Sequence, residues 1–506
     1  MSFLASLTII NTSTNVGIYG GGKAMKKSLL LALTMLFIGM FSVTGVADEP
    51  ETLAEGDFRY FINDDGSVSI AGWDGDDKEL NIPSEIDEKP VTVIKKRAVD
   101  WRFGLESIKI PASVTTVEDN AINGCDQLRR IWVSPKNKNY AVIDNVLFDK
   151  KNKVLIKYPT GSFDEEYVIP NGIKGIGADA FTMCYELKKV VIPDSVEFIG
   201  EGAFASCIWL KDLNIPDSVE SIGADAFDSC DLLLISVSSD SRYKVANGTL
   251  FDKENKTLIH CPSDESVSKY VIPKGTITIG GGSFYGCEYL TNIEIPDSVT
   301  EIGQNAFYGC SGLSGIKIPD SVTKIGKNAF DGCSGLTGIR IPDTVTNIEE
   351  YVFSGCSRIT SVEVPDSVTE IGEYAFSNCS GLTSIQLPDS IKVIRSGLFS
   401  GCDSLSGIEI PDSVTVIEEF AFVGCDYLTN IIIPDTVTKI EDYAFSGCSR
   451  LSSVEIPASV TAIGKKVFEE CDEISLVVEK DSYAAQYAEE NEIPYNYPDA
   501  NDWLND

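Results

Sequence analysis

The feature that most constrains this chain is a repeat with a fixed period of 23 residues. Between Tyr270 and Glu473 one phrase recurs nine times, roughly Ile-Pro-Asp-Ser-Val-Thr-x-Ile-Gly-x-x-Ala-Phe-x-Gly-Cys-x-x-Leu-x-x-Ile. Earlier copies begin at Pro170, Pro193 and Pro216. Self-similarity at this period is typical of solenoids, in which each repeat forms one coil and contacts only its neighbours. The sequence therefore predicts a stack of coils.

Each position of the repeat has a physical role, which the copy around Pro296 illustrates. Ile293 and Ile295 flank Glu294, so two apolar side chains face inward from a short strand and the acid faces outward. Pro296 ends that strand, because proline cannot donate a ladder hydrogen bond. A single coil cannot cover its own apolar face, so the coils above and below must do so.

The second half of the repeat predicts two further segments. Val299 and Ile302 alternate inward again, which indicates a second extended stretch. Ala306 and Phe307 are expected on a short helical or 3₁₀ turn, with the ring filling the middle of the coil. The aspartate after each proline is expected to cap its own turn. Calcium bound between neighbouring aspartates is the alternative.

The phrases Ala-Phe-x-Gly-Cys and Ile-Pro-Asp-Ser-Val-Thr-x-Ile-Gly closely resemble the BspA-like leucine-rich repeat family of bacterial surface proteins. The likeness covers nearly all of residues 58–497. It implies a single right-handed leucine-rich-repeat solenoid of short parallel β-strands, with short 3₁₀, helical or extended connections. Family members include surface antigens and adhesins, some of which bind host matrix proteins. Fold alone does not fix function, so such a role is implied here by resemblance only.

The N-terminal region carries a predicted export signal. Lys26 and Lys27 precede an apolar run, and small residues at Gly45 and Ala47 form a cleavage site before Asp48. A retained membrane anchor is the alternative. The expected segments are an upstream stretch at 1–24, a secretion signal at 25–47, an N-terminal cap with a degenerate first repeat at 48–98, the solenoid at 99–478, and a C-terminal helical cap and tail at 479–506.

Two interruptions of the period resemble each other and predict β-hairpin insertions within a coil. They lie near 135–165 and 238–268, and each has strand-like runs on both sides of a Lys-x-Asn-Lys turn. After the last repeat, residues 481–490 read as a helix with Asp481 or Ser482 as its N-cap. The solenoid is therefore expected to be capped at both ends.

The cysteines recur with the repeat, which argues against disulfides although the chain is predicted to be exported. Equivalent cysteines of neighbouring coils point the same way about 4.8 Å apart, whereas bridged Cβ atoms must converge. Free, buried thiols acting as small core groups are expected. No Cys-x-x-Cys pair occurs, so neither a metal nor another cofactor is predicted. The regular ladder consists of Cys287, Cys310, Cys333, Cys356, Cys379, Cys402, Cys425, Cys448 and Cys471.

No catalytic site is predicted. The only histidine, His260, adjoins Cys261, the one cysteine outside the repeat register. A Cys–His nucleophile needs both groups facing each other, whereas adjacent strand residues point to opposite faces. The formal net charge of −35 also argues against nucleic acid and anionic membranes as partners.

The variable positions lie on the strand face, which we define as the exposed side of the Ile-x-Ile strands. The outward residue changes at almost every coil, and Tyr427 lies in the same coil as the apolar Ile432. The sequence predicts a non-enzymatic, secreted or cell-surface protein whose strand face binds a host matrix protein, another surface protein or a glycan, with no membrane span after processing. A passive structural spacer is the alternative. The expected contact residues are Arg340, Glu363, Gln386, Glu409, Tyr427 and Ile432.

Overall fold

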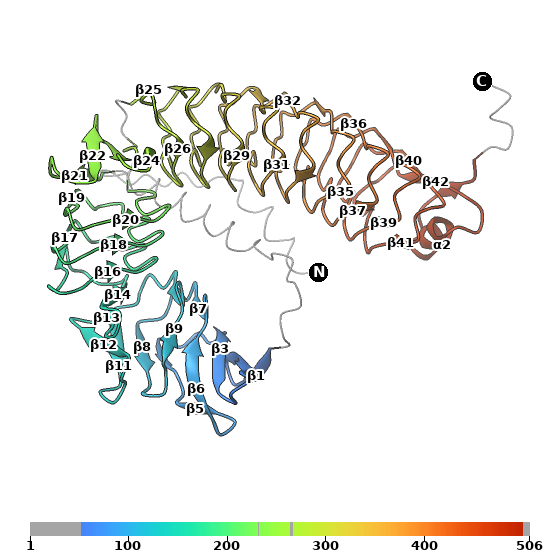
Figure 1. Cartoon of the computed structure of the whole chain (residues 1–506). Coiled ribbons are helices and arrows are strands. Elements are labelled where there is room, and N and C mark those ends of the chain that lie inside the picture. The colour runs from blue at the N-terminus through green and yellow to red at the C-terminus, as the bar shows by residue number, and fades with distance from the viewer. Residues whose placement is uncertain (1–51, 231, 264–266, 499–506) are drawn as a thin grey trace, which may run out of the picture. The chain divides into compact units, whose positions relative to one another are not determined.

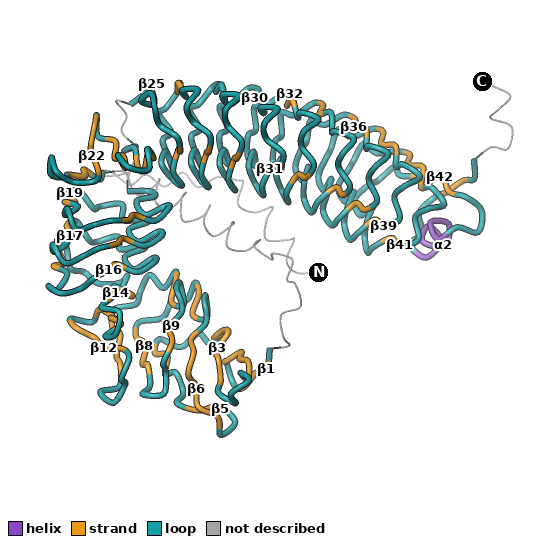
Figure 2. Tube along the Cα trace, in the orientation of Figure 1, coloured by secondary structure: helices purple, strands orange, loops and turns teal. Residues whose placement is uncertain are grey.

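The computed structural model describes residues 52–230, 232–263 and 267–498, which form a parallel β-solenoid with one short helix (Figure 1). Most of each coil is loop and turn, and the strands are short (Figure 2). The solenoid predicted from the repeat is thus confirmed. The expected upstream stretch, the secretion signal and the tail beyond Pro498 lie outside the described residues.

Most regular coils contribute a first strand whose inward residue is buried and whose neighbours face outward, and the coil around Ile316 has the same sequence pattern without an assigned strand. In β27 (Asn292–Glu294), Ile293 is buried while its two neighbours are exposed. The preceding strand β25 (Lys269–Val271) pairs with it in parallel, with Tyr270 opposite Ile293. The other first strands are β15 (Glu166–Val168), β17 (Lys189–Val191), β19 (Asp212–Asn214), β21 (Leu234–Ser236), β30 (Ile339–Arg340), β32 (Ser361–Glu363), β34 (Ser384–Ile385), β36 (Gly407–Glu409), β38 (Asn430–Ile432), β40 (Ser453–Ile456) and β42 (Ser475–Val478).

The expected second extended stretch is a two-residue strand. In β28 (Glu301–Ile302) the isoleucine is buried, and it pairs in parallel with Ile325 of β29 (Lys324–Ile325). A residue therefore lies beside the residue one period away, and this register places equivalent side chains in columns. The other second strands are β16 (Gly175–Ile176), β18 (Phe198–Ile199), β20 (Ser221–Ile222), β26 (Thr278–Ile279), β31 (Asn347–Ile348), β33 (Glu370–Ile371), β35 (Val393–Ile394), β37 (Val416–Ile417), β39 (Lys439–Ile440) and β41 (Ala462–Ile463).

The segment around Ala306 and Phe307 is a run of turns and not the 3₁₀ or helical turn that the sequence suggested. Asn305 and Gly309 have left-handed φ values of 52° and 69°. The N–H groups of Asn305, Phe307 and Gly309 donate to carbonyls of the next coil, at 2.7–2.9 Å. Because these donors are used between coils, they cannot close a helix within one coil. The turns thus form a third line of contact between coils.

A column of stacked phenylalanine rings fills the centre. Phe307 is fully buried and stacks on Phe330, with ring centroids 5.2 Å apart and planes within 5°. All fourteen cysteines are buried, and no two of them are bonded to each other. The Cys333 thiol lies 3.1 Å from the carbonyl oxygen of Phe307 in the preceding coil, and the other regular copies repeat this contact between thiol and carbonyl. The thiols therefore satisfy polar backbone groups in addition to filling space.

Both insertions predicted from the sequence are present, and each has one strand more than expected. In the first, β12 (Tyr140–Ile143), β13 (Val146–Asp149) and β14 (Val154–Lys157) are antiparallel, and β14 then pairs in parallel with the following coil. The second repeats this arrangement with β22 (Tyr243–Ala246), β23 (Thr249–Asp252) and β24 (Thr257–His260). The apolar core divides at these insertions into three clusters of buried residues.

The two ends of the repeat array carry non-repeat elements. At the C-terminal end, α2 (Tyr483–Glu490) begins at the predicted N-cap Ser482, whose hydroxyl accepts from the Ala485 N–H. Tyr487 of this helix is buried in the core of the last coils, and β43 (Tyr495–Asn496) pairs with β42. At the N-terminal end lie β1 (Leu53–Glu55), β2 (Phe58–Ile62), β3 (Val68–Trp73), β4 (Glu79–Asn81), β5 (Glu85–Ile86) and β6 (Lys89–Ile94). The first coils follow with β7 (Val99–Asp100), β8 (Ser107–Ile110), β9 (Thr116–Val117), β10 (Ile122–Asn123) and β11 (Arg130–Val133), and β8 and β11 pair in parallel.

Candidate interaction surface

The strand face is held by the parallel pairing of the first strands. Arg340 lies opposite Glu363 across β30 and β32, and Glu409 lies opposite Ile432 across β36 and β38. Gln386 follows β34 directly. All of these side chains are exposed, because in each strand the neighbouring isoleucine or valine faces the core. The structure thus places these predicted residues on one side of successive coils.

Tyr427 and Ile432 form the apolar part of this surface. Tyr427 is 49% exposed, and Ile432 is 68% exposed between Glu409 and Glu455 in the neighbouring strands. The guanidinium carbon of Arg450 lies 3.7 Å from the centroid of the Tyr427 ring, which is a close cation–π contact. The same coil thus presents an aromatic ring with a cation over it and, further along the chain, an exposed aliphatic side chain, which are residue types that protein interfaces favour.

Arg340 forms ion pairs with two aspartates of its own and the preceding coil. Its guanidinium lies 2.8 Å from the Asp320 carboxylate and 3.5 Å from that of Asp343, and the hydrogen bond that it donates to Asp320 raises the pKa of Arg340. Exposed pairs of this kind contribute little to stability. They do fix the direction of the Arg340 side chain, so a ligand at this position meets an arginine that is already partly neutralised.

The expected role of the Pro-Asp aspartates is wrong. In the described part of the chain none of them caps its own turn. The next residue does the bonding, because its hydroxyl reaches the preceding coil: Ser298 Oγ donates to the Thr276 carbonyl at 2.7 Å, and Ser321 Oγ donates to the Val299 carbonyl at 2.6 Å. The turn is therefore tied to its neighbour by this hydroxyl, and the exposed aspartates make other contacts where they have a partner, as Asp217 does with Ser238 and Asp320 with Arg340.

Two residues before the outward residue, the strands carry small or short polar residues, such as Gly338 before Arg340 and Gly407 before Glu409, and this part of the strand face is flat. A Cβ added to Gly338 or Gly407 would have no atom closer than 3.9 Å. The adjoining hydroxyls are used internally, since Thr383 Oγ1 donates to the Thr360 carbonyl at 3.1 Å. A partner can therefore approach the backbone here without displacing side chains.

His260 and Cys261 are both buried, which removes them from solvent. Burial lowers the pKa of His260 to about 4, and its Nε2 has no hydrogen-bond partner. The His260 ring packs 5.7 Å from the Phe227 ring. Within residues 52–498, apart from the undescribed positions, no group of three or more His, Cys, Asp or Glu side chains is arranged to hold a metal ion.

Sequence reasoning missed a second set of exposed apolar side chains on the strand face of earlier coils. Val168 is 63% exposed and lies opposite Val191, which is 40% exposed. Leu234, two strands further along, is 63% exposed. For Val168 and Val191 the signal was present in the same outward column of the repeat, where their coils carry valine in place of a charged residue. Leu234 lies in the neighbouring column, opposite Asp212.

Fold and surface together define a leucine-rich-repeat β-solenoid with an exposed face of parallel strands. The model of the BspA type leucine-rich repeat region matches residues 78–163, 157–271, 259–383 and 369–484, and the chain belongs to this family. No curated protein matches the chain. Among the described residues, no helix is long and apolar enough to cross a membrane.

Several solved structures of bacterial leucine-rich repeat proteins are similar to most of the chain. A leucine-rich repeat protein from Bacteroides ovatus is 25% identical, covering 88% of this chain and 99% of its own, with a TM-score of 0.43. A leucine-rich cell surface protein from Faecalibacterium prausnitzii is 26% identical over 80% of this chain and 95% of its own, with a TM-score of 0.35. The pneumococcal vaccine antigen PcpA is 21% identical over 77% and 93%, with a TM-score of 0.37. Because these TM-scores are low, the family assignment rests on the family model.

Proposed function

We propose that the protein is an exported, non-enzymatic surface protein whose strand face binds a protein or glycan partner. The observation that carries this proposal is the group formed by Tyr427, Arg450 and Ile432. A 68% exposed isoleucine in the same coil as an aromatic ring covered by an arginine is costly to leave in water and suits a contact anchor. Residues 340–409 extend the same surface towards the preceding coils.

Membership of the family supports a location at the cell surface, and the similar Faecalibacterium protein is itself described as a cell surface protein. Residues 25–47 would then direct export, and the elements around 48–98 and 479–498 would cover the ends of the array. The buried positions of His260 and Cys261 support a role without chemistry.

A passive spacer is the second candidate, and one observation favours it. The threonine hydroxyls beside the first strands donate to carbonyl groups of the preceding coil. These polar groups on the strand face therefore stabilise the stack of coils and are not free to bind a partner. In such a protein the number of coils sets a length and the outward residues vary without consequence.

Capture experiments separate the two. Residues 48–506 are immobilised and exposed to extracellular-matrix proteins, bacterial surface proteins and cell-wall glycans, and bound material is eluted with the free chain as competitor. Saturable capture that the free chain competes away is expected. Absence of any saturable binder across the three fractions would favour the spacer, and turnover of a bound glycan or protein would indicate an enzyme.

A further inference from the structure

A second surface, beside the second strands, carries a column of aromatic side chains that the proposed function does not use. Tyr351 stacks on Tyr374 with ring centroids 5.0 Å apart, and Phe420 stacks on Tyr443 at 5.3 Å. All four rings are half-buried and lie at equivalent positions of their coils. We call this column, with the acidic residue that precedes each ring, the acidic-aromatic strip.

Folding alone does not account for aromatic residues at this position. The four residues have left-handed φ values of 55–58°, a conformation that bulky side chains rarely adopt. Other coils place Asn305, Asn328 or Gly397 there, which are the residue types that tolerate it best. Backbone strain at a bulky residue, repeated in four coils, is a feature that often accompanies binding sites.

Carboxylates accompany the rings in the same four coils. Glu350, Glu373, Glu419 and Asp442 each directly precede an aromatic residue, whereas the coils with asparagine or glycine carry glutamine, lysine or serine there. Burial, together with the neighbouring acids, raises the pKa of Glu373 and of Glu419. In the described residues neither side chain makes an ion pair or a hydrogen bond. Negative charge is thus concentrated here, and Arg395 offsets only part of it at Glu373.

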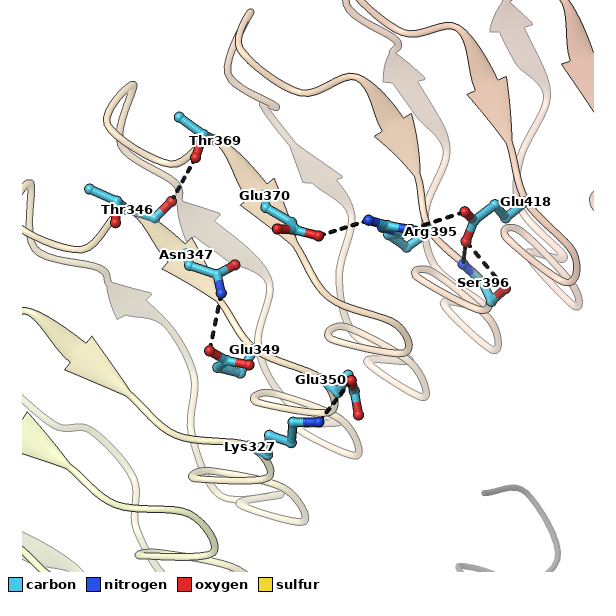
Figure 3. A network of polar contacts seen from close by, with 10 residues as sticks. All are labelled: Lys327, Thr346, Asn347, Glu349, Glu350, Thr369, Glu370, Arg395, Ser396 and Glu418. Atoms are coloured by element: carbon cyan, nitrogen blue, oxygen red, sulfur yellow. Dashed lines mark hydrogen bonds and ion pairs between the residues drawn. The ribbon is translucent and has the colours of Figure 1, made fainter. Parts of the chain in front are cut away.

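Three basic side chains of the protein itself already contact this surface or the residues beside it. The Lys466 ammonium lies 5.6 Å from the centroid of the Tyr443 ring, at the C-terminal end of the strip. At the opposite end, Lys327 lies 2.9 Å from Glu350. In the coil between the two aromatic pairs, Arg395 reaches Glu370 at 2.7 Å and Glu418 at 3.3 Å (Figure 3). Both kinds of contact, cation on ring and cation on carboxylate, therefore already occur along the strip.

We propose that the acidic-aromatic strip docks a lysine- and arginine-rich segment of a partner protein. The ammonium and guanidinium groups of the partner segment would pair with Glu373 and Glu419 and lie over the exposed parts of the rings. These contacts are of the same kinds as the ion pairs of Arg395 and the contact of Lys466 with the Tyr443 ring. The strip follows the second strands, whereas the strand face is formed by the first strands. Because the two surfaces differ, this proposal can be tested independently of the proposed function.

The test uses fluorescein-labelled decalysine and decaarginine as probes, with binding to the full chain followed by anisotropy at moderate salt. The strip variant is Glu373→Gln with Glu419→Gln. Its matched control is Glu363→Gln with Glu409→Gln, which removes the same charge from the strand face. The strip variant should weaken binding about fivefold, and the control less than about twofold. Equal weakening by both would mean general attraction to an acidic protein and would overturn the proposal.

A second variant tests the rings without endangering the fold. Tyr351→Asn with Tyr443→Asn introduces the residue that other coils already hold at this position, and it should also weaken binding about fivefold while the melting temperature is kept. Unchanged binding would show that the rings do not contact the polycation, which contradicts the proposed site. A calcium titration completes the test: calcium binding that the strip variant abolishes, with no polycation binding, would assign the carboxylates to a metal and overturn the proposal.

Discussion

The Cys356 sulfur lies 3.3 Å from the carbonyl oxygen of Phe330, one coil earlier. This contact uses the thiol proton, and burial raises the pKa of Cys356 well above its ordinary value. A thiol held in this way is a poor nucleophile, because the reactive species is the thiolate. The cysteine column is therefore a structural device in which each thiol ties one coil to the previous one.

The first prediction concerns these thiols. Native protein should react slowly with a bulky thiol reagent, and denaturation without reductant should release all fourteen thiols. Cys261 should react first, since hydrogen bonding to Cys287 lowers its pKa. Intact-mass measurement provides the check, and a mass deficit of several hydrogen pairs would contradict the free-thiol column.

The second prediction concerns Asp331, which is largely enclosed by neighbouring coils. Burial raises the pKa of Asp331 to about 7 from an ordinary value of 3.8. Because the folded state binds this proton more tightly than the unfolded state, the resulting stabilisation is full below about pH 4 and is lost as the pH rises through 7. Asp331→Asn should therefore stabilise the protein by about 1–3 kcal/mol at pH 8 and have little effect at pH 4.

Chemical denaturation at the two pH values measures this difference. Asp366→Asn is the matched control, because that aspartate is exposed and should change stability at neither pH. A stability gain from Asp331→Asn that is the same at both pH values would show that the carboxyl does not titrate between them.

The period of 23 residues determined most of the fold in advance, because it is carried by core side chains such as Phe307, Cys310 and Leu313. The turn segment was not predictable from propensity, since its donors bond to the next coil and not within their own. The Arg450–Tyr427 contact could have been read from the sequence. The two residues are one period apart, and the register makes such residues neighbours.

The third prediction concerns the C-terminal helix. Deletion of residues 366–388 removes one whole period, which leaves the remaining interfaces in register and should give a soluble monomer. Deletion of residues 480–506 removes Ala484, Tyr487 and Ala488 from the core and exposes the last coil, so association is expected. Sedimentation velocity and melting curves compare the two, with deletion of 499–506 as the control. A monomeric cap deletion with the parent melting temperature would mean that the helix does not act as a cap.

The last prediction concerns the strand face. Tyr427→Ser with Ile432→Ser should leave the melting temperature unchanged, because both side chains are about half exposed or more. It should weaken binding to the captured partner by about 1–2 kcal/mol, the range expected for an anchor residue. Val168→Ser with Val191→Ser is the control, since it removes the other exposed apolar pair on the same face. Loss of binding in the control alone would move the site to the earlier coils, and a lowered melting temperature of the Tyr427 and Ile432 variant would show that these side chains support the fold.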